Sequence, residues 1–209
     1  MKKKLLIIFV KNIKLGKVKT RLAKSIGNEA AFEVYKELVN ITENATNNLK
    51  IDKRIYFSDA VVDTKWQNDF KTVQSGIDLG ERMKNAFADG FNLGYEDIIL
   101  IGSDLPDISK IIIESGFKAL KINEVVFGPA EDGGYYLIGM NKLHSFIFED
   151  KPWSQSHLLD VSLQELNKNN VGFSLLEILN DIDTYEDLIA SNFYKNNIDL
   201  QQKISQLND

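Results

Sequence analysis

The feature that most constrains the fold is a run of six apolar residues, Leu5 to Val10, near the start of the sequence. The run is continuous and does not alternate with polar residues, which is typical of a central parallel strand covered by helices on both faces. A second solid run, Ile98 to Ile101, has the same character. The chain is therefore expected to form an α/β sheet with helices on both sides.

The rest of the sequence alternates between strand and helix patterns. The expected strands are residues 5–10, 54–58, 72–76, 98–101, 125–127, 135–140 and 171–176, and the expected helices begin at Thr20, with an interruption near Gly27, and cover 79–93, 109–120, 158–166 and 184–191. This order predicts a doubly wound, mostly parallel (mixed) sheet flanked by helices. We expect one domain over residues 1–194 and a polar tail over 195–209.

Composition restricts the class of protein. The chain has 209 residues, 44% of them hydrophobic, which is enough for one substantial core. The net charge of -5 argues against nucleic-acid binding, which needs a broad basic surface. The absence of cysteine excludes disulfides and thiolate chemistry. No apolar run approaches the roughly 20 residues of a membrane span, so a cytoplasmic protein with small-molecule partners is expected.

A dense set of cations lies between the first strand and the first helix, packed around Gly16. Free N–H groups at a helix N-terminus and added cations make such a loop a phosphate site. The alternative is a solvated basic loop, but a ligand binds such a sheet beyond the carboxyl ends of its strands, where this loop lies. The candidate phosphate ligands are Lys11, Gly16, Lys19 and Arg21, with Lys14 and Lys17 adding charge.

Asp104 follows the second solid apolar run directly, in the segment Ile101-Gly-Ser-Asp-Leu-Pro106. A carboxylate at a strand end can enter the coordination shell of Mg²⁺ or Mn²⁺, which prefer oxygen ligands and share them with substrate phosphates. The alternative role is that of a turn aspartate before the helix capped by Ser109. Taken alone, Asp104 fits the turn role better.

Three further clusters are candidates for the site. In residues 128–136 the glycines let the backbone approach a ligand and Asp132 supplies a carboxylate, although an Asp-Gly turn is also a common hairpin signal. In residues 181–188 a capping box accounts for Thr184 and Asp187, which leaves Asp181 and Asp183 as second-shell or direct metal carboxylates. Residues 78–83 open a helix, where Asp78 and Arg82 line a pocket or serve as a cap and a solvated side chain.

Taken in order, five segments resemble a bacterial family of glycosyltransferase-A-type proteins in the nucleotide-diphospho-sugar transferase superfamily, some associated with arsenosugar biosynthesis. The segments are Lys11…Gly16-Lys-Val-Lys-Thr-Arg-Leu-Ala23, Asp78-Leu-Gly-Glu-Arg-Met83, Ile101-Gly-Ser-Asp-Leu-Pro106, Gly128-Pro-Ala-Glu-Asp-Gly-Gly-Tyr-Tyr-Leu-Ile-Gly139 and Asp181-Ile-Asp-Thr184…Asp187-Leu188. The resemblance extends over about residues 4 to 190. The superfamily includes 2-phospholactate guanylyltransferase and the molybdenum-cofactor nucleotidyltransferases.

The resemblance implies the glycosyltransferase-A fold and assigns roles by position. Lys19 and Arg21 would bind phosphates, and Asp104 and Asp183 would bind the divalent metal, Mg²⁺ or Mn²⁺. Asp132, our candidate catalytic base, would face the acceptor or sugar with the substrate-binding residues Gly133, Gly134 and Tyr135. The first loop departs from the family, which usually has prolines near Ile13 and Leu15.

Three functions remain open on the sequence. The first is glycosyl transfer from a nucleotide-sugar to a small acceptor, in which the metal and the basic loop neutralise the departing diphosphate. The second is nucleotidylyl transfer from a nucleoside triphosphate, which needs the same phosphate and metal site. The third is a non-catalytic nucleotide-binding protein, although a pure binder has less need of two metal carboxylates.

Overall fold

The computed structural model describes residues 2–208. Its strands are β1 (Lys4–Val10), β2 (Asp52–Phe57), β3 (Phe70–Val73), β4 (Asp97–Ile101), β5 (Val125–Pro129), β6 (Tyr135–Met140) and β7 (Phe173–Leu175). Its α-helices are α1 (Thr20–Asn47), α2 (Leu79–Asn92), α3 (Lys110–Ala119), α4 (Leu158–Lys168), α5 (Tyr185–Ala190), α6 (Asn192–Lys195) and α7 (Ile198–Asn208), with a short 3-10 helix, η1 (Ser145–Ile147).

The strands form one mixed sheet in the order β3-β2-β1-β4-β6-β5-β7. Strand β1 pairs in parallel with β2 and β4, with Ile8 opposite both Ile55 and Ile101. Only β6 runs against its neighbours, pairing antiparallel with β4 and β5. The predicted mostly parallel, mixed α/β sheet is therefore confirmed.

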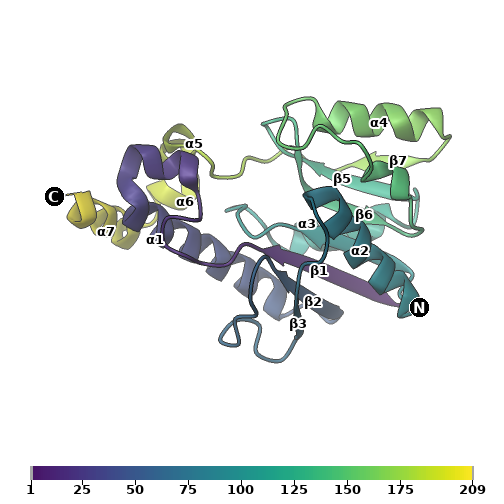
Figure 1. Cartoon of the computed structure of the whole chain (residues 1–209), viewed down its shortest axis with the longest axis horizontal. Coiled ribbons are helices and arrows are strands. Elements are labelled where there is room, and N and C mark those ends of the chain that lie inside the picture. Colours follow the sequence, from purple (N-terminus) through teal and green to yellow (C-terminus); the bar gives the residue numbers. More distant parts are fainter. Residues whose placement is uncertain (1, 209) are drawn as a thin grey trace.

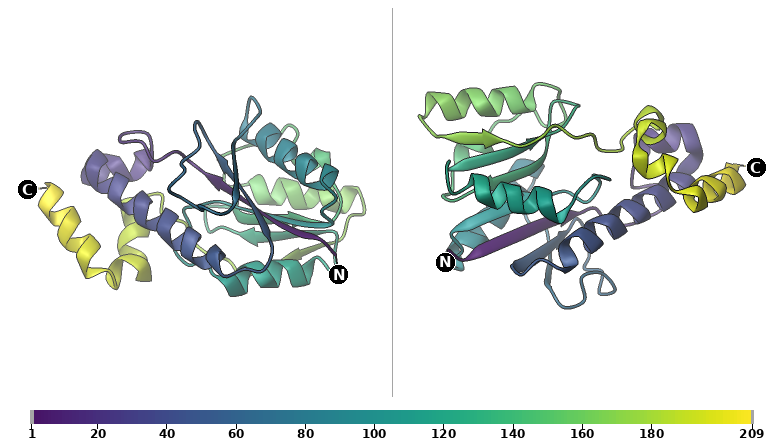
Figure 2. Two further views of the ribbon diagram at one scale, coloured as in Figure 1. Left: turned by 90° about the horizontal axis from the view of Figure 1, so that it is seen from below. Right: turned by 180° about the vertical axis from the view of Figure 1, so that it is seen from behind.

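Two helical layers cover the sheet, as the continuous apolar strands require. Alternate residues of β1 face opposite layers: Ile8 packs into the core that contains α1 and α3, and Ile7 packs into the core that contains α2 and α4. Figures 1 and 2 show α1 and α3 on one side of the sheet and α2 and α4 on the other. The period-two alternation of a strand thus buries both sets of side chains.

Helix α1 bends at Gly27, whose backbone (φ 81°, ψ 160°) is not helical. Its N-terminal half extends past the sheet and buries a small core against the C-terminal helices. That core includes Leu22 and Ile26 of α1, Leu188 of α5, and Leu200 and Ile204 of α7. The polar segment after residue 194 thus contains a helix with a buried apolar face.

One strand lies elsewhere than the sequence pattern indicated. The third strand spans Phe70–Val73 instead of residues 72–76, because its parallel pairing with β2 begins at Arg54 opposite Phe70 and ends at Phe57 opposite Val73. Beyond it the chain turns at Gly76, whose φ is +145°. A short edge strand with exposed side chains carries little apolar periodicity from which to predict its bounds. None of the helices within residues 2–208 has the length and apolar character needed to cross a bilayer.

Candidate metal and phosphate site

The loop after β1 is held in place by one buried amide. Asn12 is 7% exposed, and its side-chain oxygen accepts hydrogen bonds from the backbone N–H groups of Asp59 (2.7 Å) and Ala60 (3.1 Å). Its amide nitrogen donates to the Ala60 carbonyl at 2.6 Å. The loop is therefore fixed to the segment that follows β2, although it lacks the prolines usual in the family it resembles.

Lys19 ends this loop and caps α1 in a left-handed conformation (φ 47°, ψ 48°), which costs a residue with a side chain roughly 1–2 kcal/mol. Its side chain is 4% exposed and its ammonium donates to Asp104 (3.0 Å) and Asp183 (3.1 Å). The remaining cations of the loop are exposed, and Arg21 reaches Asp183 at 3.4 Å. The basic loop thus has one buried cation and a solvent-facing group.

Asp104 lies in the turn after β4, and its neighbour Ser103 is 3% exposed. The Ser103 hydroxyl is 3.0 Å from the hydroxyl of Tyr35, which itself donates to the Lys11 carbonyl at 3.1 Å. Tyr35 comes from the buried face of α1. One tyrosine therefore ties the basic loop and the acidic turn to the same helix.

Asp181 and Asp183 come from an extended segment that leaves β7 and runs beside the end of β5. Leu179 of this segment donates to the Pro129 carbonyl at 3.1 Å and accepts from Glu131 N–H at 3.0 Å. At its far end Thr184 caps α5 in a capping box with Asp187, as the sequence predicted. The sheet edge and the helix cap together fix where the two carboxylates lie.

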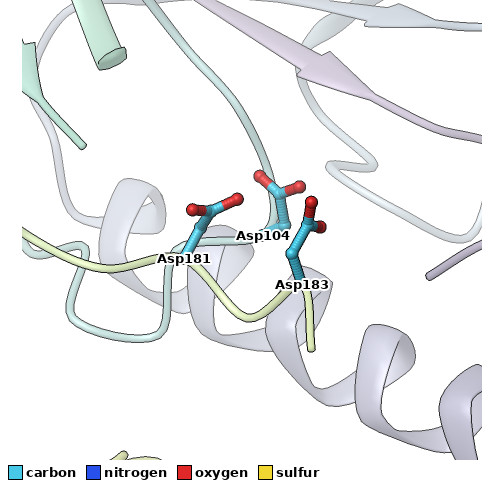
Figure 3. Close-up of side chains that lie close together, drawn as sticks. All are labelled: Asp104, Asp181 and Asp183. Atoms are coloured by element: carbon cyan, nitrogen blue, oxygen red, sulfur yellow. The ribbon is translucent and has the colours of Figure 1, made fainter. Parts of the chain in front are cut away.

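The three aspartates form one cluster, with one oxygen from each carboxylate lying within 4.8 Å of the others. Figure 3 shows Asp104 on the turn after β4, facing Asp181 and Asp183 on the segment before α5. Mg²⁺ and Mn²⁺ prefer such oxygen ligands, so the donor set fits a divalent cation. Among the described residues this is the one group of three or more potential metal ligands.

The pKa shifts show strong coupling in the cluster. Burial alone would lower the pKa of Lys19, but the charges of Asp104 and Asp183 raise it above its usual range. Burial likewise opposes the charge of Asp104, whose pKa the Lys19 ammonium holds below its usual range. Burial and the nearby charge of Asp104 raise the pKa of Asp181 to about 7. The cluster carries more negative charge than Lys19 balances, a condition that favours a bound cation.

A pocket of about 230 Å³ adjoins the cluster, and Asp104 and Asp181 form part of its wall. Its floor is apolar and includes Met83 of α2 and Leu100 of β4. Burial raises the pKa of Tyr135, another wall residue, so its phenol is neutral at ordinary pH. The metal-ligating candidates thus lie between the basic loop and a largely apolar pocket.

The other residues proposed from the sequence fall into two groups. Asp132, Gly134 and Tyr135 line the pocket, and Gly133 is in the same turn with φ +86°. Asp78 caps α2 by accepting from Glu81 N–H at 2.8 Å, and Arg82 donates to the Gly76 carbonyl at 3.1 Å; no contact joins either residue to the carboxylate cluster within residues 2–208. Gly16 is exposed in the basic loop with φ +72°.

Two residues of the site were not predicted from the sequence. Asp181 was one of two open possibilities in its segment and was not selected as a metal ligand, yet its carboxylate is in the cluster. Trp153, which no sequence motif singles out, lines the pocket. Spacing relative to the capping box pointed to Asp181, whereas no motif surrounds Trp153.

Comparison with known proteins identifies a family and solved structures that the chain resembles. Residues 42–155 match the family model described as "Uncharacterized protein conserved in bacteria (DUF2064)". No curated protein matches the chain in sequence. A crystal structure from Desulfovibrio desulfuricans G20, assigned to the nucleotide-diphospho-sugar transferases, is 28% identical with a TM-score of 0.84, over 99% of this chain and 97% of that one.

More distant structures share the fold. A cytidylyltransferase from Leptospira borgpetersenii serovar Hardjo-bovis has 15% identity and a TM-score of 0.58, over 100% of this chain and 97% of that one. A manganese complex of Rv0371c from Mycobacterium tuberculosis H37Rv has 10% identity and a TM-score of 0.54, over 90% and 97%. The expected glycosyltransferase-A-type fold agrees with all three structures. The expectation of a transferase agrees with the assignment of the Desulfovibrio protein.

Proposed function

The chain belongs to the DUF2064 family of bacterial proteins, and we propose that it is a metal-dependent transferase that transfers a glycosyl group from a nucleotide-sugar to a small acceptor. The observation that carries the proposal is the meeting of the basic loop and three aspartates at the carboxyl ends of β1 and β4. In open α/β sheets this edge is where ligands bind. The likeness to the Desulfovibrio structure supports a nucleotide-diphosphate substrate.

We assign the metal to Asp104 and Asp183, as the sequence suggested, and add Asp181 as a third carboxylate. When bound, Mg²⁺ or Mn²⁺ supplies positive charge next to the diphosphate. A protein with this fold, Rv0371c, is known as a manganese complex, which supports a divalent metal here. A cluster that fits a cation, beside a loop that fits an anion, is what a metal-diphosphate substrate requires.

The cations of the loop supply the second half of the site. Lys11, Lys17 and Arg21 are exposed, and the free N–H groups of the first turn of α1 face the same loop. One charge pair about 4 Å apart contributes about 4 kcal/mol at an effective dielectric near 20. Because the leaving diphosphate gains charge as its bond breaks, these groups stabilise the transition state more than the ground state.

In glycosyl transfer the acceptor oxygen forms a bond to the anomeric carbon, and the bond from that carbon to the diphosphate oxygen breaks. The diphosphate leaves with the electron pair, and the acceptor proton passes to a base. Asp132 is the candidate base: its carboxylate lines the pocket beside Asp104, and one oxygen accepts from Gly134 N–H at 2.8 Å.

Nucleotidylyl transfer is the second candidate. There a substrate oxyanion attacks the α-phosphate of a nucleoside triphosphate and pyrophosphate leaves. The observation in its favour is the number of cations in residues 11–21, which suits the greater charge of a triphosphate. A third function, nucleotide binding without turnover, would use the same groups.

A thermal-shift screen tests the proposal. Nucleoside diphosphates, triphosphates and nucleotide-sugars are each added with and without Mn²⁺, and we expect nucleotide-sugars to raise the melting temperature only when the metal is present. Stabilisation by triphosphates alone would favour nucleotidylyl transfer. No response to any nucleotide would rule out all three functions.

Product analysis separates the two reactions. Incubation with nucleotide-sugars and a pool of small acceptors should release a nucleoside diphosphate, whereas incubation with triphosphates should release no pyrophosphate. Pyrophosphate release would replace the first candidate by the second. Metal-dependent binding of nucleotides without either product would support the non-catalytic alternative.

A further inference from the structure

The pocket beside the carboxylate cluster differs in character from the rest of the site. Aromatic and aliphatic side chains form most of its wall, among them Phe9 of β1, Met83 of α2, Ile138 of β6 and Trp153. Its uncharged residues with polar groups are Ser154, Gln155 and the two tyrosines, Tyr135 and Tyr136. The pocket therefore offers non-polar surface over which a flat ring can lie.

Two glycines bring the wall together. A Cβ at Gly80, in the first turn of α2, would lie 2.3 Å from the Phe148 carbonyl oxygen and 2.7 Å from the Trp153 ring. At Gly133 a Cβ would lie 1.8 Å from the Ser156 carbonyl oxygen. Backbone and ring can approach this closely only where Cβ is missing, so the Trp153 wall is held against both α2 and the β5–β6 turn.

Charge is distributed unevenly around this pocket. Its charged wall residues are three aspartates, Asp104, Asp132 and Asp181, and no lysine, arginine or histidine contributes to the wall in the described part of the chain. The nearest cation, Lys19, donates to Asp104 and Asp183 from outside the wall. All three positions around the pocket that carry charge are therefore acidic.

A second lysine near Trp153 is unavailable to a ligand. Lys151 has a side chain that is 1% exposed, and its ammonium bonds to the carbonyls of Phe146 (2.7 Å) and Glu149 (2.6 Å) and to the Glu165 carboxylate (2.7 Å). Two of the three ammonium donors are used by these carbonyls, and the ion pair with Glu165 balances the charge. Within residues 2–208 no lysine, arginine or histidine side chain of the wall is therefore left to pair with an anion inside the pocket.

We propose that this pocket binds an uncharged ring with a non-polar face, such as a neutral sugar, and excludes rings that carry a carboxylate or phosphate. The inference rests on the proposed transferase function and specifies the substrate class of the same site. A carboxylate or phosphate entering here would lose water and gain no cation from a side chain of the wall. The charge of the metal at the border would already be shared by its carboxylates and the diphosphate, and Asp132 would repel a further anion. A neutral sugar ring loses less hydration than an anionic one, and its non-polar face gains contact with Trp153.

The neutral ring has two potential sources, the sugar of the donor and the acceptor. The donor sugar and the acceptor would each present an uncharged ring to the same pocket wall. They differ in whether the ring is attached to the nucleotide, which competition can detect. The donor sugar would exclude a free ring from the pocket, whereas an acceptor would bind together with the nucleotide-sugar.

Tryptophan fluorescence provides the test. The chain has two tryptophans, and Trp66 is 1% exposed and bonded to Thr46, so a change in emission on adding a ligand reports Trp153. The probes are phenyl β-D-glucoside and phenyl β-D-glucuronide, which differ only by an uncharged hydroxymethyl group and a carboxylate. With Mg²⁺ present, we expect the glucoside to bind at least about tenfold more tightly. Equal binding, tighter binding of the glucuronide, or no saturable response to the glucoside would overturn the inference.

A charge variant makes the test specific. Gln155 is exposed at the pocket wall, so Gln155→Lys adds a cation there, and Gln155→Met is the control of similar length without charge. We expect Gln155→Lys to reduce the preference for the glucoside by about tenfold, and Gln155→Met to keep it. A preference that does not change in the lysine variant would also count against the inference. Trp153→Phe should remove the emission response and confirms its source.

Nucleotide binding is measured in parallel, so that the two proposals fail separately. If metal-dependent nucleotide stabilisation is present and the glucuronide binds as well as the glucoside, the transferase proposal stands and the pocket inference fails. If the glucoside is preferred and no nucleotide binds, the reverse holds. Where both succeed, UDP-glucose and GDP-mannose are compared with UDP and GDP as competitors. Displacement by the nucleotide-sugar alone identifies the donor sugar, and displacement by neither identifies the acceptor.

Discussion

The basic loop and the pocket lie at the same edge of the sheet, yet they are built for opposite ligands. The loop carries the cations of the site, whereas the charged residues that line the pocket are aspartates. Asp104 and Asp181 lie at the border and belong to both the carboxylate cluster and the pocket wall. The two proposals together describe a ligand in two parts, with an anionic diphosphate and its metal on the loop side and an uncharged ring on the pocket side.

Substitution of Asp104, which belongs to both the carboxylate cluster and the pocket wall, should have the largest effect on metal binding and activity. Asp104→Asn takes away a charge from the cluster and a partner of Lys19, and we expect the metal-dependent rise in melting temperature to disappear. Activity should fall by about 10²-fold or more, in line with the loss of one stabilising group for the transition state. Differential scanning fluorimetry with and without Mn²⁺ measures the first effect.

Asp107→Asn provides the control for this variant. Asp107 is exposed and lies three residues further along the same turn, outside the cluster. Its metal response should match that of the unmodified protein. A normal metal response in Asp104→Asn would refute the assigned role of Asp104.

Lys19→Met tests the loop side of the comparison. The variant leaves Asp104 and Asp183 without their buried cation. Breaking a fully buried pair costs about 3–5 kcal/mol, and since each carboxylate is 41% exposed we expect the cost without metal to be about 2–3 kcal/mol. This corresponds to a fall in melting temperature of roughly 5–10 °C.

The metal response of Lys19→Met should run opposite to that of Asp104→Asn. With more uncompensated negative charge, added Mn²⁺ should raise the melting temperature further than it does in the unmodified protein. Lys17→Met, an exposed position in the same loop, is the control and should change neither value. Equal metal responses in Lys19→Met and the unmodified protein would mean that Lys19 does not balance the cluster.

Asp181→Asn tests how the carboxylate shared by the metal site and the pocket wall affects stability. The pKa of Asp181 rises from an ordinary 3.8 to about 7 in the folded protein, because of burial and the charge of Asp104. Between these values the folded state binds more protons than the unfolded state, so without metal this residue lowers stability as the pH rises from about 4 to about 7.

The asparagine variant removes this pH dependence. Without metal at a pH well above 7, Asp181→Asn should melt higher than the unmodified protein by up to about 8–16 °C, since the rise of the Asp181 pKa from 3.8 to about 7 corresponds to about 4 kcal/mol, and near pH 4 the gain should vanish. With Mn²⁺ the order should reverse, because one metal carboxylate is lost. Melting curves at several pH values measure both. If the variant is less stable than the unmodified protein without metal at high pH, the charge of Asp181 does not destabilise the fold.

The sequence alone predicted the sheet and part of the site, on different grounds. Solid apolar runs identify β1 and β4, and the rule that ligands bind at the carboxyl ends of strands predicts that Lys19 and Asp104 lie at one edge. The meeting of Asp104 with Asp183 came from the family resemblance, because nothing in local spacing relates residues so far apart.

What could not be predicted depends on tertiary contacts. Asp181 joins the cluster because Leu179 pairs beside the end of β5, a pairing of one isolated bridge without a strand pattern. Trp153 reaches the pocket because Gly80 leaves space for its ring, which is a contact between distant segments. The loop lacks the prolines usual in the family it resembles, and a single asparagine, Asn12, fixes it through hydrogen bonds that spacing does not reveal.

The smallest effect we predict compares two contacts of that loop with the segment after β2. Asn12→Ala removes bonds from a buried amide, and we expect a loss of about 1 kcal/mol or more, roughly 2–4 °C. Lys14→Ala removes an ion pair with Asp59 in which the two side chains are 54% and 56% exposed, and such exposed pairs contribute little to stability.

Nucleotide affinity tests whether Asn12 also orients the loop for ligand binding. If Asn12 orients the loop, Asn12→Ala should weaken metal-dependent nucleotide binding and leave glucoside binding to the pocket unchanged, because the pocket wall contains no loop residue. A parallel loss of both would mean that the loop and the pocket are coupled, contrary to the division of the ligand into two parts.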